Sequence, residues 1–206
     1  MRFADLDAVT IDAFGTLVEL EDPVPALQAA LRERGLERSR QQVERAFEAE
    51  GAYYRSHIAE GHDEEGLRRL RVACAGVFLQ AAEAELPPEE FAPTYVASLR
   101  FRVLDGVEDA LASLRARGLE LAVVGNWDIG LTEYLDQLGL SAYFRLILPV
   151  AQKPSPTRLL EALERLGVSP PRALHVGDES ADAEAAAAAG MQFLPAPLSD
   201  ALAQLE

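Results

Sequence analysis

Short apolar runs recur along the chain, with the length and branched side chains that are typical of buried parallel strands. The runs predicted as strands are Ala8 to Ile11, Leu119 to Val124, Leu146 to Val150, Ala173 to Val176 and Met191 to Leu194. A parallel sheet is covered on both faces, so its strands can be apolar throughout instead of alternating with polar residues. These runs therefore predict one buried parallel sheet.

Helical patterns separate the later strands, and a glycine follows each of them. The predicted helices are Val107 to Arg117, Ile129 to Leu138, Ser155 to Leu166 and Ser180 to Ala189. The glycines, which stand where a helix commonly ends in a left-handed residue, are Gly118, Gly139, Gly167 and Gly190. Alternating strands and helices are typical of an α/β fold with a doubly wound parallel sheet, which binds ligands at the carboxyl ends of its strands.

Residues 18–99 break this alternation. They hold amphipathic helical patterns and no convincing strand, with helices predicted over Pro23 to Arg34, Arg40 to Ala59, Glu64 to Ala84 and Pro88 to Phe101. Because the stretch begins after the first strand, it predicts an inserted α-helical cap domain over the carboxyl end of that strand. Residues 1–17 and 100–206 then form the Rossmann-like core.

Composition narrows the class of protein. The chain has 206 residues, of which 49% are hydrophobic and 26% charged, as in ordinary globular proteins. Its net charge of −15 repels the phosphate backbone of nucleic acids, so we expect no nucleic-acid partner. The single cysteine, Cys74, cannot form an internal disulfide. With no secretory signal and no run of about 18 apolar residues, we expect a cytoplasmic protein without a membrane segment. The oligomeric state stays open.

Acidic residues follow two of the predicted strands. Asp12 ends the first strand, and Asp178 comes directly after the fourth, so both carboxylates are expected at one edge of the sheet. Two carboxylates close together at one edge repel one another unless a cation lies between them. Mg²⁺ prefers oxygen ligands and keeps several waters, so it suits this edge.

A lysine is expected at the same edge. Eighteen of the nineteen basic residues are arginine, and the single lysine, Lys153, follows the third predicted strand. Its isolation has a functional explanation and a neutral one, namely chance in an arginine-rich composition. Asn126 follows the second strand, and Asp128 is expected to cap the helix that begins near Ile129. His175, inside the fourth strand, is predicted to be structural.

Four motifs in order carry a family resemblance. The segments IDAFGTL, VVGNWD, KPSP and HVGDESAD follow four of the predicted strands. They resemble the four motifs of the haloacid dehalogenase-like (HAD) hydrolase superfamily with a helical cap of the first type. The resemblance extends over the whole chain, and four motifs in the family order are far more specific than any one of them.

The resemblance implies a catalytic machinery. Asp12 would be the nucleophile that forms a covalent aspartyl intermediate, which water then hydrolyses. Asp12, the main-chain carbonyl of Phe14 and the carboxylate of Asp178 would hold Mg²⁺. Lys153 would neutralise the nucleophile and the transferred group, and Asp182 would orient Lys153 or a metal-bound water. Together they predict a Mg²⁺-dependent phosphatase acting on a small phosphorylated metabolite.

Substrate contacts are expected from the neighbouring loops. Thr16 would hydrogen-bond within its turn or near the phosphate, and Asn126 would line the site. The motif-two serine or threonine of the family is Gly125 here, so only main-chain N–H groups near Gly125 and Asn126 could bind phosphoryl oxygens. Arg45 in the cap is a candidate for substrate binding, with Arg55 behind it.

Phe14 is a further departure from the family and leaves three functions open. Phosphatases of the family carry a second aspartate at this position as general acid and base, a group typically worth 10² to 10⁴ in rate. An aromatic residue here resembles the first motif of L-2-haloacid dehalogenases, whose leaving halide needs no proton. Those enzymes are metal-free and lack the Gly-Asp pair present here at Gly177 and Asp178. The third alternative is a non-catalytic member that binds metal and a phosphate ligand.

Overall fold

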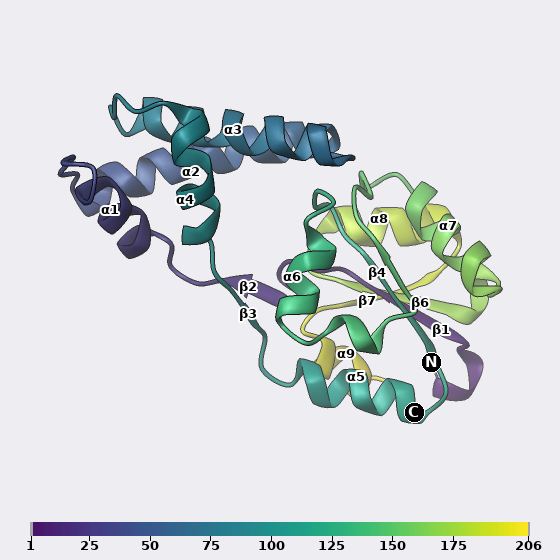
Figure 1. The fold of residues 1–206 in the computed structure, drawn as a ribbon. Helices are drawn as coiled ribbons and strands as arrows, with labels where there is room; N and C mark the ends of the chain where they lie inside the picture. The colour runs from purple at the N-terminus through teal and green to yellow at the C-terminus, as the bar shows by residue number, and fades with distance from the viewer. Residues whose placement is uncertain (1, 206) are drawn as a thin grey trace. The chain divides into compact units, whose positions relative to one another are not determined.

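The computed structural model describes residues 2–205, which fall into two compact units. The sheet unit runs up to Glu19 and resumes at Arg102, and the helical unit is Leu20–Phe101. Both are drawn in Figure 1. That the first is a catalytic core and the second a cap over its site stays a prediction. None of the helices in the described part of the chain has the length and apolar character needed to cross a membrane.

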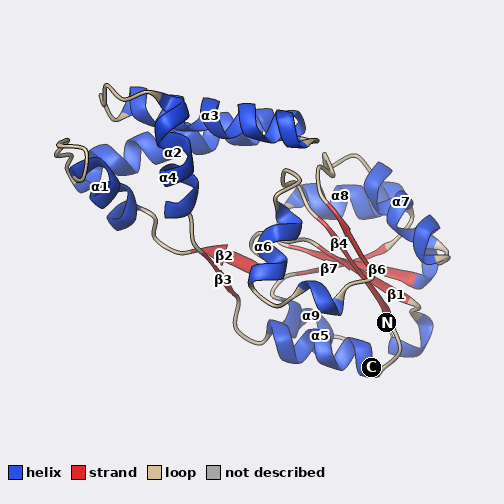
Figure 2. Ribbon diagram, in the orientation of Figure 1, coloured by secondary structure: helices blue, strands red, loops and turns tan. Residues whose placement is uncertain are grey.

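A five-stranded parallel sheet forms the middle of the sheet unit (Figure 2). Its strand order is β5-β4-β1-β6-β7. The strands are β1 (Ala8–Ile11), β4 (Glu120–Val124), β5 (Leu146–Leu148), β6 (Ala173–Gly177) and β7 (Gln192–Pro195). All five predicted strands are confirmed, although β5 ends at Leu148, before the predicted limit. The carboxyl ends of β1, β4, β5 and β6 therefore share one edge.

Helices cover both faces of this sheet, as expected for a doubly wound fold. The helices of the unit are α5 (Val107–Ala116), α6 (Leu131–Gln137), α7 (Thr157–Leu166), α8 (Ser180–Ala189) and α9 (Leu198–Ala203). Figure 1 shows α7 and α8 on one side of the sheet and α5 and α9 on the other. The glycines predicted to end helices all have left-handed backbone, at Gly118, Gly139, Gly167 and Gly190. Helix α9 was not predicted.

Two short strands were missed. β2 (Val18–Leu20) lies in the stretch predicted to contain no strand, and it pairs with β3 (Phe101–Val103) in a separate two-stranded sheet. The predicted helix from Pro88 to Phe101 was too long, because the backbone is already extended at Leu99. Strands of three residues carry too little periodicity to be recognised in a sequence. The chain passes between its two units at these strands.

The helical unit has its own core. Its helices are α1 (Val24–Arg32), α2 (Arg40–His57), α3 (Glu64–Ala81) and α4 (Pro88–Ser98). Three buried rings, those of Phe78, Phe91 and Tyr95, pack together with centroids 5.1 to 6.4 Å apart. The short 3₁₀ helices of the chain are η1 (Phe3–Asp5), η2 (Ile58–Gly61), η3 (Ser141–Tyr143) and η4 (Pro170–Arg172).

Candidate active site

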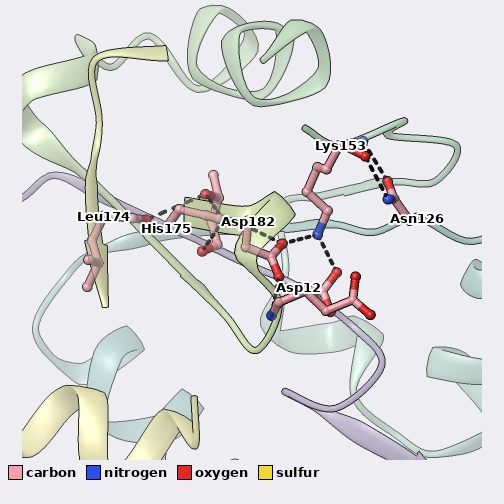
Figure 3. Close-up of polar contacts among 8 residues, drawn as sticks. Asp12, Asn126, Lys153, Leu174, His175 and Asp182 are labelled. Carbon is pink, nitrogen blue, oxygen red and sulfur yellow. Dashed lines mark hydrogen bonds and ion pairs between the residues drawn. The ribbon is translucent and has the colours of Figure 1, made fainter. Parts of the chain in front are cut away.

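Lys153 lies between two carboxylates at the carboxyl edge of the sheet. Its Nζ atom forms ion pairs with Oδ1 of Asp12, which follows β1, and with Oδ1 of Asp182 on α8 (Figure 3). The Lys153 side chain is only 3% exposed. A buried ammonium is costly unless it is paired, and here both of its partners are also buried. The parallel strands thus bring the first, third and fourth motifs into direct contact.

The two carboxylates that contact Lys153 differ in acidity. Burial raises the pKa of Asp12 to about 6, although the charge of Lys153 acts in the opposite direction. Burial also opposes ionisation of Asp182, but the hydrogen bond from His175 and the charge of Lys153 outweigh it and hold its pKa at about 2. Asp182 is therefore a stable anion at neutral pH, whereas Asp12 carries a charge that its surroundings do not fully compensate.

A third carboxylate completes an acidic cluster. Asp12, Asp178 and Asp182 each offer an oxygen that lies within 4.8 Å of the others. Partial burial, followed by the charges of Asp182 and Glu179, raises the pKa of Asp178. With Lys153 as the neighbouring cation, the three ionised carboxylates would leave an excess of two negative charges. A divalent cation would balance that excess.

The oxygens of Asp182 are already occupied by the protein. Oδ1 contacts Lys153 and His175, and Oδ2 accepts a hydrogen bond of 3.0 Å from the main-chain N–H of Glu179. Asp12 and Asp178 are therefore the carboxylates best suited to face a metal ion. This division of the cluster fits a Mg²⁺ site next to the ion pair between Lys153 and Asp182.

Two motif glycines let carboxylates lie directly against the main chain. Gly15 has a φ of +80°, and a Cβ placed there would lie 2.1 Å from Oδ2 of Asp178. At Gly177 a Cβ would lie 2.3 Å from Cγ of Asp182. Any larger residue at either position would displace an acidic side chain, so the acidic cluster itself requires both glycines.

The loop that carries Lys153 has unusual backbone. Val150 and Gln152 have φ values of 54° and 55°, which are unfavourable for a β-branched and a long side chain. Hydrogen bonds to the loop after β4 hold this conformation: the N–H of Val150 donates to Trp127 O at 2.7 Å, and that of Ala151 to Gly125 O at 3.1 Å. The lysine thus stands on a segment anchored to a neighbouring strand end.

Asn126 adds to this anchor. Its Oδ1 accepts from the main-chain N–H of Lys153 at 2.8 Å, and its Nδ2 donates to the carbonyl of the same residue at 3.2 Å (Figure 3). The side chain was expected to line the site for substrate, whereas its amide groups contact the main chain of Lys153. The N–H of Gly125, expected as a phosphate donor, donates instead to Leu148 O at 3.2 Å.

The remaining candidate residues are placed as follows. Thr16 is buried, and its Oγ1 has no hydrogen-bond partner among residues 2–205, so its hydroxyl does not bond within the turn. Phe14 is 51% exposed, and its ring meets that of Trp127 edge-on at a centroid distance of 6.3 Å. Arg45 is an exposed residue of α2 in the helical unit. Asp128 accepts from the N–H of Gly130 at 2.8 Å, just before α6.

The role of His175 could not be read from the sequence. The residue lies inside β6 and was predicted to be structural, yet its Nε2 is 3.1 Å from Oδ1 of Asp182. The only available signal was the spacing of seven residues between a strand position and a helix position, and this does not fix the directions of the side chains. The structure therefore adds His175 to the residues that contact the acidic cluster.

Comparison with known proteins defines the class. A family model described as haloacid dehalogenase-like hydrolase matches residues 6–190. The chain belongs to the haloacid dehalogenase-like hydrolases, which confirms the resemblance carried by the four motifs. Its α/β fold agrees with that membership.

Several curated relatives are phosphatases by name. The chain is 34% identical over 191 residues to a phosphoglycolate phosphatase of Pseudomonas putida, covering 89% of this chain and 66% of that protein. It is 31% identical over 198 residues to one of Aquifex aeolicus, covering 88% and 80%. Haloacid dehalogenase-like hydrolase domain-containing protein 3 of Mus musculus is 41% identical over 111 residues, covering 50% of this chain and 44% of the relative. The chain thus spans less than two thirds of the mouse and P. putida proteins.

Solved structures share the fold. A putative beta-phosphoglucomutase of Thermotoga maritima is similar with a TM-score of 0.69 and 22% identity, over 91% of this chain and 84% of that one. The L-2-haloacid dehalogenase of Xanthobacter autotrophicus is similar with a TM-score of 0.65 and 22% identity, over 91% and 76%. At these identities the likeness concerns the fold and does not separate phosphatases from dehalogenases.

Proposed function

We propose that the chain is a Mg²⁺-dependent phosphatase that hydrolyses a small phosphorylated metabolite through an aspartyl-phosphate on Asp12. The observation that carries this proposal is the buried Lys153 paired with Asp12 and Asp182, next to the carboxylate of Asp178. The excess negative charge of this cluster favours a divalent cation. Relatives named phosphoglycolate phosphatase support phosphate as the transferred group.

In the first step, an oxygen of Asp12 attacks phosphorus, and the bond between phosphorus and the leaving-group oxygen breaks. Lys153 contacts Oδ1 of Asp12, so we assign the attack to Oδ2. The ammonium keeps the carboxylate in place and offsets negative charge that develops on the transferred group. In the second step, water attacks phosphorus, inorganic phosphate leaves, and the carboxylate of Asp12 is regenerated with release of a proton.

A magnesium ion would be held by Asp12, the main-chain carbonyl of Phe14 and Asp178. When bound, it would offset the charge of the phosphoryl oxygens. The buried hydroxyl of Thr16, which lacks a partner among the described residues, is our candidate for a hydrogen bond to phosphate. Arg45 stays a candidate for the rest of the substrate, on the proposal that the helical unit is a cap domain. We also propose that the enzyme acts in the cytoplasm.

Phe14 restricts the leaving group. A phenyl ring cannot give a proton to the departing oxygen, so a leaving group that is stable as an anion should react fastest. Acyl and aryl phosphates meet this condition, whereas alkyl phosphates such as phosphoglycolate do not. Phe14 is also the observation that favours a second candidate, a 2-haloacid dehalogenase, because halide leaves without a proton.

One substrate panel tests the proposal. Purified protein is assayed with acetyl phosphate, p-nitrophenyl phosphate, phosphoglycolate and 2-chloropropionate, with Mg²⁺ or with EDTA, and Asp12→Asn serves as the inactive control. We expect phosphate release that EDTA abolishes, fastest with the first two compounds. Chloride release in the presence of EDTA would establish the dehalogenase instead. Binding of Mg²⁺ without turnover of any compound would indicate a non-catalytic member of the family.

A further inference from the structure

Thr10 and His175 form a polar pair inside two otherwise apolar strands. They are register partners on β1 and β6, and both are fully buried. The remaining residues of β1 are apolar, as are Leu174 and Val176 on either side of the histidine. A buried polar pair lowers stability unless its hydrogen bonds are satisfied, so the pair invites a specific explanation.

Hydrogen bonds join this pair to the acidic cluster. Nδ1 of His175 is 2.8 Å from Oγ1 of Thr10. On the other side of the ring, Nε2 is 3.1 Å from Oδ1 of Asp182 (Figure 3). The same carboxylate oxygen contacts Nζ of Lys153. A continuous chain of polar contacts therefore runs from Thr10 through His175 and Asp182 to Lys153, and from there to Asp12.

The chemistry of these groups determines the direction of each hydrogen bond. An ionised carboxylate can only accept, so Nε2 of His175 carries the proton that it donates to Asp182. In a neutral imidazole Nδ1 then accepts, and Thr10 donates its hydroxyl proton to it. The other acceptor near that hydroxyl, Leu174 O, is 3.5 Å away, at the limit for a hydrogen bond.

The neutral form of His175 is favoured by its surroundings. Burial lowers the pKa of His175, and the nearby charge of Lys153 also lowers it, although the hydrogen bond to Asp182 acts against both. A protonated ring would instead donate from Nδ1 to the carbonyl of Thr10, which is 3.1 Å away. The neutral ring with its proton on Nε2 satisfies the contacts to Oγ1 of Thr10 and to Oδ1 of Asp182, at a lower electrostatic cost than the protonated ring. In that form Nδ1 donates no proton to the carbonyl of Thr10.

We infer that Thr10 and His175 are positioning residues that fix the orientation of the Asp182 carboxylate and thereby the ammonium group of Lys153. Asp182 sets the tautomer by accepting the proton of Nε2, and the hydroxyl of Thr10 holds the ring in that orientation by donating to Nδ1. Oδ2 is held separately by the main chain at Glu179. With both oxygens held, Asp182 presents one fixed acceptor to Lys153. The catalytic consequence rests on the proposed function, whereas the hydrogen-bond pattern does not.

Two pairs of variants test the inference. Thr10→Val removes the hydroxyl with little change in shape, and Thr10→Ser keeps it as the matched control. His175→Leu removes both ring nitrogens, and His175→Gln retains an N–H donor for Asp182. With p-nitrophenyl phosphate and Mg²⁺, we expect Thr10→Val to lower kcat about tenfold with little change in KM, because small displacements of a positioned group are costly. The kcat of Thr10→Ser should stay near that of the wild type, and the kcat of His175→Gln should exceed that of His175→Leu.

Non-additivity separates positioning from a general loss of packing. If Thr10 acts only through the imidazole, then the double variant with Thr10→Val and His175→Leu should be no slower than His175→Leu alone. Additive losses in kcat, or equal kcat for Thr10→Val and Thr10→Ser, would overturn the inference.

An NMR measurement tests the hydrogen bonds without any turnover. Nitrogen-15 shifts of His175 in the metal-free protein at pH 7 should show a proton on Nε2 and a hydrogen-bonded lone pair on Nδ1, and the latter signature should be lost in Thr10→Val only. A proton on Nδ1 in wild-type protein would contradict the inference. Absence of phosphate release from the wild-type protein would contradict the proposed function, and the NMR result would still decide whether Thr10 orients His175.

Discussion

Asn126 binds both main-chain polar groups of Lys153 through its side-chain amide, at 2.8 Å to the N–H and 3.2 Å to the carbonyl. The contact links the loop after β4 to the loop after β5, and it resembles the pairing between two strands. Lys153 is therefore held at two levels, by Asn126 at its main chain and by Asp12 and Asp182 at its ammonium group.

Asn126→Ala should loosen the main chain under the lysine. We expect kcat to fall between about 10-fold and 100-fold with a smaller change in KM, because the substitution displaces the ammonium group to which we assign a catalytic role without removing it. The lost hydrogen bonds should lower the free energy of unfolding by about 1–3 kcal/mol. Steady-state kinetics and urea unfolding measure the two effects. Gln137→Ala, which alters an exposed amide on α6, is the control, and an unchanged kcat in Asn126→Ala would remove Asn126 from this role.

Mg²⁺ should raise the melting temperature of the protein, because a ligand that binds only the folded state stabilises it, by about 2.7 kcal/mol at 100 times its Kd. Asp178→Asn should abolish this increment. Glu184→Gln, which changes an exposed residue of α8, should leave it intact. Differential scanning fluorimetry over a range of Mg²⁺ concentrations measures both. A normal Mg²⁺ response in Asp178→Asn would show that the ion binds elsewhere.

Phe14→Asp should supply the missing proton donor. We expect hydrolysis of alkyl phosphates to increase on the order of 10²-fold, with a smaller effect on p-nitrophenyl phosphate, whose leaving group needs no proton. Adding Gly125→Ser, which restores a phosphate-binding hydroxyl, should increase the gain further. Asp12→Asn should remove activity in every background. If folded, metal-binding double variants gain nothing on any phosphate ester, Phe14 serves a chemistry other than phosphate transfer.

Gly15→Ala should have a larger effect than alanine at a left-handed glycine far from the acidic cluster, such as Gly118. Gly15 and Gly118 have φ values of +80° and +78°, so alanine at either position carries a similar backbone penalty of about 1–2 kcal/mol. At Gly118 a Cβ meets nothing within 4 Å, whereas at Gly15 it would displace the Asp178 carboxylate. We therefore expect both variants to lose stability and only Gly15→Ala to lose the Mg²⁺ response. Equal Mg²⁺ responses would contradict the packing of Asp178 against Gly15.

Glu50 should make the helical unit more stable in acid. Burial raises the pKa of this buried glutamate above its ordinary value of 4.5, although Tyr95 and Cys74 favour the carboxylate. The folded chain then keeps a proton on Glu50 that the unfolded chain has lost, so stability should fall as pH rises from about 4.5 through the folded-state pKa. Glu50→Gln should remove that part of the fall, measured as Tm against pH. Glu48→Gln, an exposed change on α2, should follow the wild-type curve.

The sequence was sufficient for the sheet and for part of the site geometry. Short apolar runs locate the strands, and parallel strands bring Asp12, Lys153 and Asp178 to one edge whatever their separation in the chain. The sequence was insufficient to predict the contacts of His175 and Asn126, because the partners of these side chains depend on side-chain direction and loop conformation. Strands as short as β2 and β3 leave no periodic pattern, and a six-residue helix such as α9 leaves a weak one.

The burial of a solitary lysine gives the folded chain an unusual chemical surface. Lys153 carries the only side-chain amine in the sequence, and that side chain is 3% exposed. Amine-acylating reagents consequently find no accessible lysine on the folded protein, while unfolding of the sheet unit uncovers one. A single acyl group in the peptide around Lys153, detected by mass spectrometry, thus reports opening of the candidate active site in unmodified protein without an engineered label.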